Sequence, residues 1–266
     1  MSLLFVDSNC DLGCELIGKL SAECIDFCKV DTPSDSQSKC REISEEEYYD
    51  IFSQCFDRGD DVAYAFASQK IYNIQNLEKA KDKLSKDYPD RKLQLIDTNS
   101  FSIGQGLISY ALALEYRNGA SVDELKDISE KIKSEYQVFI AVDSINNLIN
   151  NKLLDGKASV GTSLNIKNII SIGTDGRFEM LDKVSGKKKS MNRLIEYISE
   201  LGSNVVDYPI AIVYTREDEA EELRAKVTEA LGEDTQILME KFTPNNLDTL
   251  GTNGVGICFH TRKRVM

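Results

Sequence analysis

Residues 96–107, Ile-Asp-Thr-Asn-Ser-Phe-Ser-Ile-Gly-Gln-Gly-Leu, constrain the fold more than any other stretch of this chain. An apolar run at residues 93–96 is typical of a strand, and helical apolar spacing follows at residues 107–116. Small hydroxyl and amide side chains lie between them, which favours a loop at a helix N-terminus. Such a loop offers hydroxyls and free backbone N–H groups to an anionic head group. The more common alternative is an ordinary helix cap, with two glycines that allow close packing.

The first 150 or so residues alternate between strand and helix patterns, which indicates a parallel sheet covered by helices on both faces. In such folds the ligand crevice lies beyond the carboxyl ends of the strands. Three expected strand ends carry polar groups: Asp7-Ser8, Ser68, and residues 97–100. Their convergence predicts a binding site at this edge of the sheet. Strands are expected at residues 3–6, 25–30, 62–67, 93–96 and 138–142, with helices at 11–20, 48–56 (capped by Ser44), 74–84, 107–118 and 121–136 (capped by Ser121).

The pattern changes after Gly156. Two apolar segments flank Asp175-Gly176, which predicts a β-hairpin. We therefore expect an α/β N-terminal domain with a mainly parallel sheet at residues 1–155, and an α+β C-terminal domain at residues 156–266. In the second domain, strands are expected at 166–172, 177–181, 210–214, 236–241 and 254–259, and helices at 187–201 and 217–231.

The composition excludes several classes of protein. A formal net charge of −12 argues against general nucleic-acid binding, which requires a basic face. The longest apolar runs fall far short of the roughly 20 residues of a membrane helix, so no integral membrane segment is expected. Residues 1–6 lack the basic lead and the length of a signal peptide. We expect a cytoplasmic protein.

The chain has seven cysteines, an odd number that does not suggest a disulfide framework in a chain of this size. Cys10 and Cys14, like Cys24 and Cys28, are four residues apart and would share one side of a helix. Structural zinc sites commonly use closer Cys-x-x-Cys pairs, and no histidine lies nearby. Reduced, partly buried thiols are expected, with no metal site.

Four segments in order resemble the DegV family, bacterial fatty-acid-binding proteins. They are the opening strand and loop at residues 6–12, the central loop and helix at 97–107, residues 161–167 with Asp175-Gly176 after them, and residues 183–188. The resemblance covers nearly the whole chain. It implies a two-domain DegV-like fold with one long-chain fatty acid buried between the domains as the ligand, and no cofactor.

The resemblance also implies site residues. In the family a pair of serines ends the strand that corresponds to 62–67; here the pair is Ala67-Ser68, so Ser68 keeps one hydroxyl for the acyl carboxylate. Asn99, Ser100 and backbone amides before the helix would complete the shell, and Ser8 lies at the neighbouring strand end.

The chain departs from the family at three motifs. Residues 56–62 leave no room for the Thr-Ser-Gln-Pro-Ser motif, whose threonine would hold the carboxylate. Gly-Gly-Arg is replaced by Asn150-Asn151-Lys152, and the late His-Thr-Gly-Pro-Gly motif falls at residues 249–253 without histidine or proline. Related carriers use the arginine and histidine motifs toward a fatty acid kinase subunit. Lys152 and Thr249 are therefore the candidate partner-facing positions.

Two other classes of function remain open. One is a ligand-binding or partner-binding protein that has lost fatty-acid recognition. The other is a small-molecule enzyme on the same scaffold, with Asp7 and Asp97 as acid and base if their strands adjoin, although loop bracing is the commoner role. His260 lies among Thr261 and three basic residues, so a solvated tail is expected there. The basic runs at 187–189 and 262–264 are expected to be solvated ends or to face an acidic partner. No catalytic residues, and no enzymatic activity of the chain alone, are expected.

Overall fold

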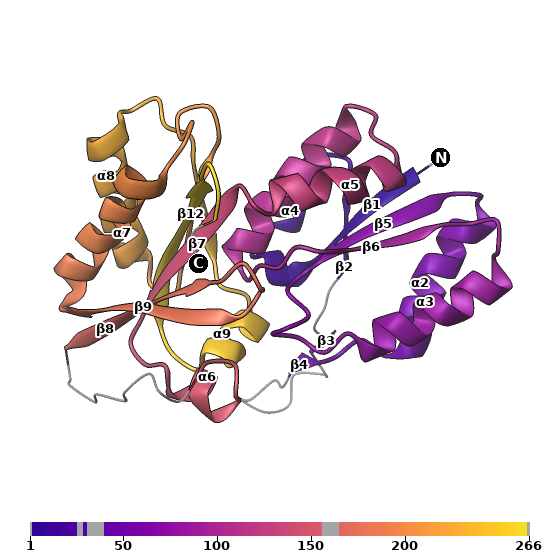
Figure 1. Cartoon of the computed structure of the whole chain (residues 1–266), viewed down its shortest axis with the longest axis horizontal. Coiled ribbons are helices and arrows are strands. Elements are labelled where there is room, and N and C mark those ends of the chain that lie inside the picture. The colour runs from indigo at the N-terminus through magenta and orange to yellow at the C-terminus, as the bar shows by residue number, and fades with distance from the viewer. Residues whose placement is uncertain (1, 26–28, 31–39, 156–164, 265–266) are drawn as a thin grey trace.

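The computed structural model describes residues 2–25, 29–30, 40–155 and 165–264. They form two sheets side by side, with helix α4 between them (Figure 1). The first sheet is entirely parallel. Its strand order is β2 (Glu23–Ile25), β1 (Ser2–Asp7), β5 (Asp61–Phe66) and β6 (Leu93–Asp97).

Helices cover both faces of this parallel sheet, because successive strand residues point to opposite faces and both sets are apolar. Phe5 and Tyr64 pack with one helix pair, whereas Leu4 and Ala63 pack with the other. The first pair is α2 (Glu45–Asp57) and α3 (Gln75–Asp87), and the second is α4 (Ile103–Arg117) and α5 (Val122–Ile132). The short α1 (Cys14–Lys19) contacts β2. The caps expected at Ser44 and Ser121 are confirmed as capping boxes with Glu47 and Glu124.

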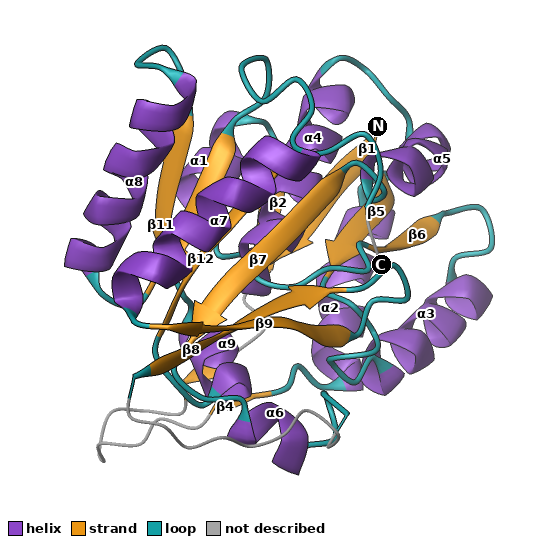
Figure 2. Cartoon of the chain, turned by 60° about the vertical axis from the view of Figure 1, so that its left-hand side comes forward, coloured by secondary structure: helices purple, strands orange, loops and turns teal. Residues whose placement is uncertain are grey.

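The second sheet is mixed, and only its β10–β11 pair is parallel. Its order is β11 (Ile237–Lys241), β10 (Ile210–Tyr214), β12 (Gly254–His260), β7 (Tyr136–Val142), β8 (Ile166–Ile172) and β9 (Phe178–Ser185). Helices α7 (Lys187–Leu201) and α8 (Glu217–Leu231) lie together over one face (Figure 2). Helix α4 packs on the other face, against β7, β10 and β12. The expected combination of an α/β part and an α+β part is confirmed.

Strand β7 is placed differently from the sequence expectation. Its residues were expected in the parallel sheet of a domain ending at residue 155, but they pair antiparallel with β12 and β8 in the second sheet. The chain therefore leaves the first sheet after Asp97 and enters the second at Tyr136. A strand that is buried on both faces has the same apolar pattern in either sheet, so the sequence does not distinguish the two placements.

The smaller elements lie at the lower edge of both sheets in Figure 1. They are β3 (Lys29–Val30) and β4 (Cys40–Arg41), which pair antiparallel, α6 (Asn146–Asn150), and α9 (Pro244–Leu250), which contacts α6. The strand expected at 25–30 is divided between β2 and β3. Helix α9 was not expected from the sequence.

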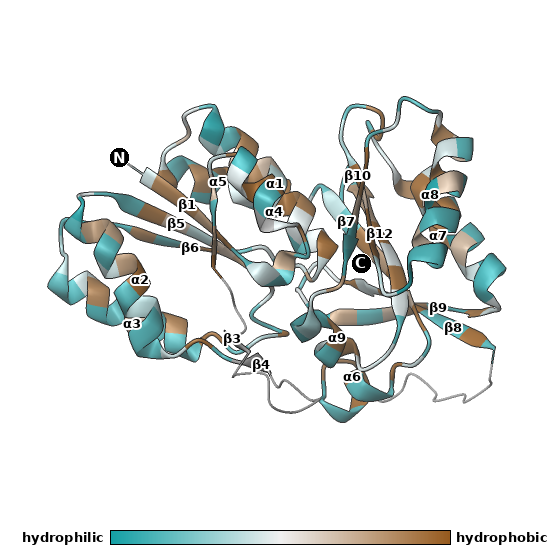
Figure 3. Cartoon of the chain, turned by 180° about the vertical axis from the view of Figure 1, so that it is seen from behind, coloured by the Kyte–Doolittle hydropathy of each residue, from teal (hydrophilic) through white to brown (hydrophobic). Residues whose placement is uncertain are grey.

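One apolar cluster joins the two halves of the molecule. It includes Val6 of the first sheet, Leu107 of α4, and Val138 and Val213 of the second sheet, all buried. Figure 3 shows apolar residues on the strands and on the inward sides of the helices, with polar residues outside. No helix in the described part of the chain is long and apolar enough to cross a membrane.

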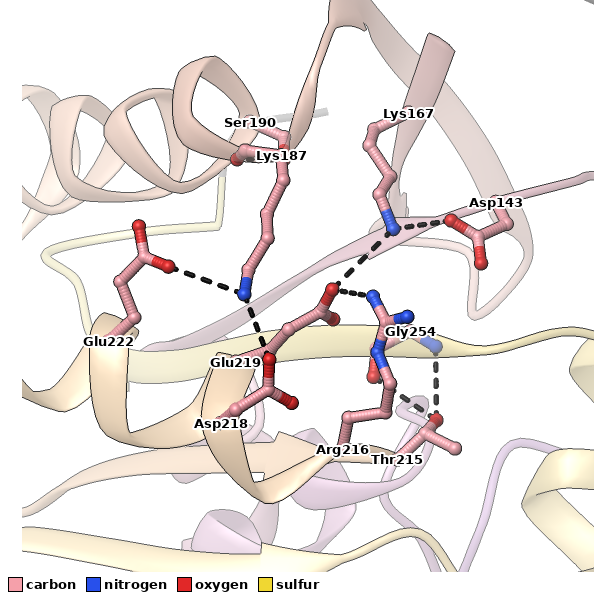
Figure 4. A network of polar contacts seen from close by, with 10 residues as sticks. All are labelled: Asp143, Lys167, Lys187, Ser190, Thr215, Arg216, Asp218, Glu219, Glu222 and Gly254. Carbon is pink, nitrogen blue, oxygen red and sulfur yellow. Dashed lines mark hydrogen bonds and ion pairs between the residues drawn. The ribbon is translucent and has the colours of Figure 1, made fainter. Parts of the chain in front are cut away.

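The start of α8 is tied to α7 by ion pairs (Figure 4). Lys187, the first residue of α7, lies 3.2 Å from Asp218 and 3.3 Å from Glu222. Arg216, just before α8, pairs with the buried Glu219 in its first turn. Within the basic run at 187–189, Lys187 thus faces acidic residues of the same chain.

Candidate functional site

The carboxyl ends of β5 and β6 meet in one polar loop cluster, as the sequence predicts. The backbone N–H of Ser68 donates to the carbonyl of Ser100 over 2.8 Å, and the Thr98 hydroxyl donates to the carbonyl of Phe66 over 2.9 Å. Ser68, Thr98 and Ser100 are all buried. These bonds fix the two loops side by side and place Ala67 and Ser68 next to Asn99 and Ser100.

The turn between β8 and β9 lies directly against this cluster. Ser68 Oγ accepts from the N–H of Lys70 over 3.2 Å and donates to the carbonyl of Gly176 over 2.7 Å. Asn99 Nδ2 donates to the carbonyl of Thr174 over 3.3 Å. Gly176 has φ +82°, and a Cβ there would overlap Ser68 Oγ and lie 3.0 Å from Asn99 Oδ1. Glycine is therefore required twice, by the backbone conformation and by the close approach.

Asp7 organises the end of β1. Its carboxylate accepts from the N–H of Asn9 (2.9 Å), the N–H of Ala67 (3.0 Å) and Gln105 Nε2 (2.7 Å). Burial raises the pKa of Asp7 to about 6, while the three N–H donors favour the carboxylate and oppose the rise. Ser8 follows in a short 3-10 turn and is half-buried.

Asp7 and Asp97 do not form the acid–base pair considered as the enzymatic alternative. Strand β5 separates β1 from β6, so the two carboxylates lie at the ends of non-adjacent strands. Asp97 accepts from the N–H of Asn99 over 2.7 Å. Both aspartates brace loops: Asp7 accepts from the loops after β1 and β5, and Asp97 accepts from the loops after β6 and β5.

A second polar seam joins the loop after β1 to α9. Asp11, whose φ is +51°, accepts from the hydroxyl of Ser102 and from the N–H of Thr243, the latter over 2.6 Å. Asn246 Nδ2 donates to the carbonyl of Asn9 over 2.7 Å. Burial raises the pKa of Asp11 to about 7, and the bonds from Ser102 and Thr243 oppose this rise.

Aromatic side chains lie between the polar loop cluster at Ser68 and the polar seam at Asp11. The rings of Phe101 and Phe178 meet edge to face with centroids 5.0 Å apart, and Tyr72 stacks on Phe101 at 6.3 Å. The Tyr72 hydroxyl donates to Asn246 Oδ1 over 2.8 Å and lies 3.1 Å from Thr249 Oγ1. Phe178 of β9 thus packs in one apolar layer with Phe101 and Tyr72, which lie in the loops after β6 and β5.

A pocket of about 450 Å³ opens beside this layer. Its apolar lining is Ile149, Leu153, Leu154 and Phe178, and charged residues, including Lys152, complete the lining. Asp175 and Arg177, on either side of Gly176, line the same pocket, so the turn that accepts the hydrogen bond from Ser68 also forms part of the pocket wall. The volume falls within the range of ordinary small-molecule sites.

The structure brings together four of the five expected ligand-binding residues, Ala67, Ser68, Asn99 and Ser100, and places Ser8 at the adjacent strand end. The two expected partner-facing residues lie apart from this group. Lys152 is exposed, with φ +58°. Thr249 is half-buried, and its hydroxyl donates to the carbonyl of Asn245.

Two residues of the C-terminal segment differ from the expected solvated tail. His260 is the last residue of β12 and is buried, with its ring stacked 4.3 Å from that of Tyr208 and Nδ1 2.8 Å from the carbonyl of Ser203. Arg264 is 4% exposed and donates to backbone carbonyls, including that of Asn99. The basic local sequence predicts exposure, but segments far away in the chain bury Arg264. For example, the backbone N–H of Arg264 donates to the carbonyl of Ser134.

Three residues of this region were missed from the sequence as site residues: Tyr72, Gly176 and Asn246. In the sequence, Gly176 is a hairpin residue and part of a segment that resembles the DegV family, and neither signal indicates its contact with Ser68. Tyr72 follows the strand-end Ser68 by four residues, a weak signal, and Asn246 lies in the unexpected α9.

The comparisons with known proteins agree on one family. The family model described as "Uncharacterised protein, DegV family" matches residues 26–262. This chain belongs to the DegV family. A DegV domain-containing protein of Clostridium perfringens is 24% identical over 236 residues, which cover 80% of this chain and 81% of that protein. A DegV domain-containing protein of Lactococcus lactis is 27% identical over 195 residues, 72% of this chain and 67% of that protein.

Solved DegV structures match the fold over nearly the full length. A DegV family protein from Ruminococcus gnavus, in a refinement with vaccenic acid, has a TM-score of 0.81 at 17% identity and covers 97% of this chain and 99% of its own. A fatty-acid-binding DegV family protein from Thermus thermophilus has a TM-score of 0.80 at 19% identity, with coverages of 98% and 99%. A stearic-acid-binding protein from Eubacterium ventriosum has a TM-score of 0.80 at 18% identity, with the same coverages.

The connection between α2 and β5, where the family resemblance implies the threonine-containing motif, is short in this chain. Helix α2 ends at Asp57 and β5 begins at Asp61. Residues 161–164 of the resembling segments lie outside the described residues, as do Cys28 and the side chain of Cys14. Cys10 and Cys24 are not joined in a disulfide, and no cluster of three metal-ligating side chains occurs among the residues that the structure describes.

Proposed function

We propose that this protein binds a long-chain fatty acid between its two sheets and serves as a non-catalytic carrier. One observation carries the proposal: the polar strand ends at Ser68 and Asn99 border an apolar layer to which both sheets contribute. An amphipathic ligand with an anionic head needs these two environments side by side. The fatty acids bound by DegV proteins of the same fold support this ligand class.

The acyl chain supplies most of the binding energy. Burying about fifteen methylenes at roughly 0.8 kcal/mol each gives about 12 kcal/mol before the costs of ordering. In this proposal the tail lies along Phe101 and Phe178 and extends into the pocket lined by Leu153 and Leu154.

The carboxylate is the specific part of the ligand, because burying it without hydrogen bonds is costly. A carboxylate only accepts, so Ser68 Oγ must turn its hydrogen from the Gly176 carbonyl to the ligand. Asn99, Ser100 and neighbouring backbone amides would complete the shell, with Ser8 and Ala67 at its border. Since only one hydroxyl is offered where the family resemblance implies two, head-group recognition is expected to be looser than tail recognition.

A partner role is proposed with the same ligand. The carrier would present the carboxylate to a separate fatty acid kinase subunit, and the exposed Lys152 in the pocket lining is the candidate contact. Thr249 contacts Tyr72 within the chain and is a weaker candidate. The kinase partnership, the absence of activity in the chain alone and the cytoplasmic location remain predictions.

The test separates the contribution of the ligand's carboxylate to the affinity from that of its acyl chain. The purified protein is analysed by native mass spectrometry, delipidated, and titrated with oleate and with methyl oleate, for Ser68→Ala and for the control Ser85→Ala. Ser85 lies on α3, and its exposed hydroxyl bonds only to its own helix. A lost charge-assisted hydrogen bond, partly offset by the lost Gly176 bond, costs about 1 kcal/mol, or about fivefold in affinity.

We expect Ser68→Ala to weaken oleate about fivefold and to leave methyl oleate unchanged, while Ser85→Ala changes neither. Equal losses for acid and ester would refute the assignment of Ser68 to the carboxylate. No binding of either ligand by the unmodified protein would refute fatty-acid binding and favour the non-lipid alternatives.

A further inference from the structure

A second pocket, of about 300 Å³, lies where α4 and α5 meet one end of the mixed sheet. It is lined by Tyr136, the first residue of β7, and by His260, the last residue of β12, which are partners in the sheet. Tyr208 and Pro209, just before β10, also line it. None of its described lining residues belongs to the polar loop cluster at Ser68 or lines the pocket proposed for the acyl chain. The volume lies at the lower end of the range of small-molecule sites.

Aromatic and apolar side chains form most of the wall of this second pocket. The rings of His260 and Tyr208 stack with centroids 4.3 Å apart, and the ring of Tyr136 meets that of His260 edge to face at 5.4 Å. Tyr208 is 40% exposed, a large exposure for an aromatic side chain that packs within the chain. The helices add Tyr110, Ala111, Leu114, Ile128 and Ile132. Such a wall favours an apolar ligand, and its aromatic rings also attract cations.

The charged groups of the second pocket are predominantly acidic. Glu115 and Asp207 are exposed and form no ion pair within the residues that the structure describes. Glu135 is half-buried, and its Oε1 lies 3.8 Å from Nζ of Lys131, whose side chain is 79% exposed. Lys131 is the only lysine or arginine in the described lining, and such an exposed pair is weak. Three carboxylates against one lysine therefore give the pocket a negative potential that attracts a cation.

The hydroxyl of Tyr136 is a polar group that the described part of the chain leaves unused. Tyr136 is 3% exposed, yet its hydroxyl forms no hydrogen bond within the residues that the structure describes. A buried hydroxyl without a partner is unfavourable, and because Tyr136 lines the pocket, a bound ligand can supply the partner. Glu135, its neighbour in sequence, lines the same pocket. A hydroxyl oxygen and a carboxylate both accept hydrogen bonds, so the pair suits a cation that carries N–H donors.

We propose that the second pocket binds a small organic compound with an apolar body and a primary ammonium group. The ammonium group donates to the Glu135 carboxylate and to the Tyr136 hydroxyl oxygen, and the apolar body packs against Tyr208 and Leu114. The two exposed carboxylates of the lining add longer-range attraction and disfavour anions. The second pocket shares no residue with the proposed fatty-acid site, so the proposal does not depend on fatty-acid binding.

The test is a calorimetric titration of the delipidated full-length protein at neutral pH with three ligands of one shape. Phenethylammonium has the aromatic body and the primary ammonium group. Phenethyl alcohol retains the body without the charge, and N,N,N-trimethylphenethylammonium retains the charge without N–H donors. Together they separate the apolar, electrostatic and hydrogen-bonding contributions to the affinity.

Two variants remove the proposed acceptors, each with a matched control. Glu135→Gln removes the carboxylate, and its control is Glu130→Gln, which removes one negative charge from α5 at a residue that does not line this pocket. Tyr136→Phe removes only the hydroxyl. Its control is Tyr214→Phe, because Tyr214 is a buried tyrosine on β10 that does not line this pocket.

We expect phenethylammonium to bind saturably, about tenfold more tightly than the alcohol and about fivefold more tightly than the trimethylated compound. The loss of a hydrogen bond to a charged group costs about tenfold in affinity. Glu135→Gln should therefore weaken the ammonium compound about tenfold and Tyr136→Phe about fivefold, while either control changes its affinity less than twofold. The affinity for the alcohol should change less than twofold in Glu135→Gln.

The proposal is overturned if phenethylammonium shows no saturable binding, or if either comparison ligand binds as tightly. It is also overturned if Glu135→Gln or Tyr136→Phe weakens the ammonium compound no more than its control does. Because the variants lie outside the proposed fatty-acid site and lipid has been removed, these outcomes leave the fatty-acid proposal untouched.

Discussion

The hydroxyl of Ser68 donates a 2.7 Å hydrogen bond to the carbonyl of Gly176, a residue 108 positions later in the chain. The bond connects the strand ends of the parallel sheet to the β8–β9 turn of the mixed sheet. The hydroxyl proposed to hold a carboxylate is therefore occupied by the protein itself. A ligand competes with Gly176 for this donor.

Gly176→Ala should lower the free energy of unfolding. The positive φ alone costs an alanine about 1 kcal/mol, and the overlap with Ser68 Oγ should add at least as much. Gly119→Ala is the matched control, since Gly119 has φ +101° and a Cβ added there would meet no atom within 4 Å. Urea unfolding should show a loss about 1 kcal/mol larger for Gly176→Ala. Equal losses would mean that the turn moves away from Ser68 without cost.

Asp11→Asn should flatten the dependence of stability on pH. An aspartate titrates near pH 4 in the unfolded chain, whereas the pKa of folded Asp11 is about 7. The folded state therefore binds more protons than the unfolded state between pH 4 and 7, so the free energy of unfolding falls as pH rises through this window. Between pH 5 and 8 the titration of Asp11 should lower the free energy of unfolding by about 2.6 kcal/mol.

Asparagine retains an oxygen for the Thr243 N–H, and the Ser102 hydroxyl can rotate to accept from the new amide. Denaturant melts at pH 5 and pH 8 should thus differ less in Asp11→Asn than in the unmodified protein. A remaining decrease up to about pH 6 is expected from Asp7. An unchanged difference between the two pH values would exclude Asp11 as its origin.

Tyr72→Phe should destabilise the contact between the first sheet and α9. The substitution removes the donor to Asn246 Oδ1, and Asn246 is fully buried, so a loss of about 1 to 2 kcal/mol is expected. Tyr88→Phe is the control, because its hydroxyl bonds to Asp57 at an exposed site and should cost less than about 0.5 kcal/mol. Chemical unfolding of the two variants measures both values. A Tyr72→Phe variant as stable as Tyr88→Phe would contradict this role of the seam.

Gly106→Ala should disturb the packing of α4 on the loop after β1. An added Cβ would lie 2.5 Å from the carbonyl oxygen of Cys10 and 2.9 Å from Leu12 Cγ, which predicts a loss of about 2 kcal/mol. Gly18→Ala is the opposite case, since Gly18 lies in α1 with nothing within 4 Å. It should be neutral or stabilising by up to about 1 kcal/mol. If thermal unfolding shows the same change in Tm for both variants, this explanation of Gly106 in α4 is refuted.

Sequence periodicity predicts best those elements whose own residues show a complete amphipathic or apolar pattern. Helices α7 and α8 and strand β10 begin and end where expected, because each has a long amphipathic or wholly apolar pattern with clear limits. Helix α4 begins at Ile103, four residues before the expected start, because Ser102 adopts φ +56° and the turn forms immediately after it. Helix α9 has seven residues, too few for a periodic pattern, although Pro244 occupies a favoured first-turn position.

The strand-end part of the candidate site could be predicted because parallel strands bring their carboxyl ends to one edge. That reasoning places Ser68 beside Asn99 and Ser100. It could not supply Gly176, which lies in the β8–β9 turn, or Asn246, which lies in α9, because each bonds to a residue more than one hundred positions away in the chain. Nor could it place Arg264, whose local sequence is a basic run and whose burial depends on carbonyls of Asn99 and Ile172.

The position of β7 bears on whether the two halves can exist apart. A cut after residue 155 would leave β7 with the N-terminal piece and remove an interior strand from the mixed sheet, between β12 and β8. The C-terminal piece would then have two newly unpaired edges, and the N-terminal piece an apolar strand without a neighbour. We therefore expect neither fragment to fold on its own. We expect the chain to unfold in a single cooperative transition, and dissection at that point to give insoluble pieces that regain structure only when combined.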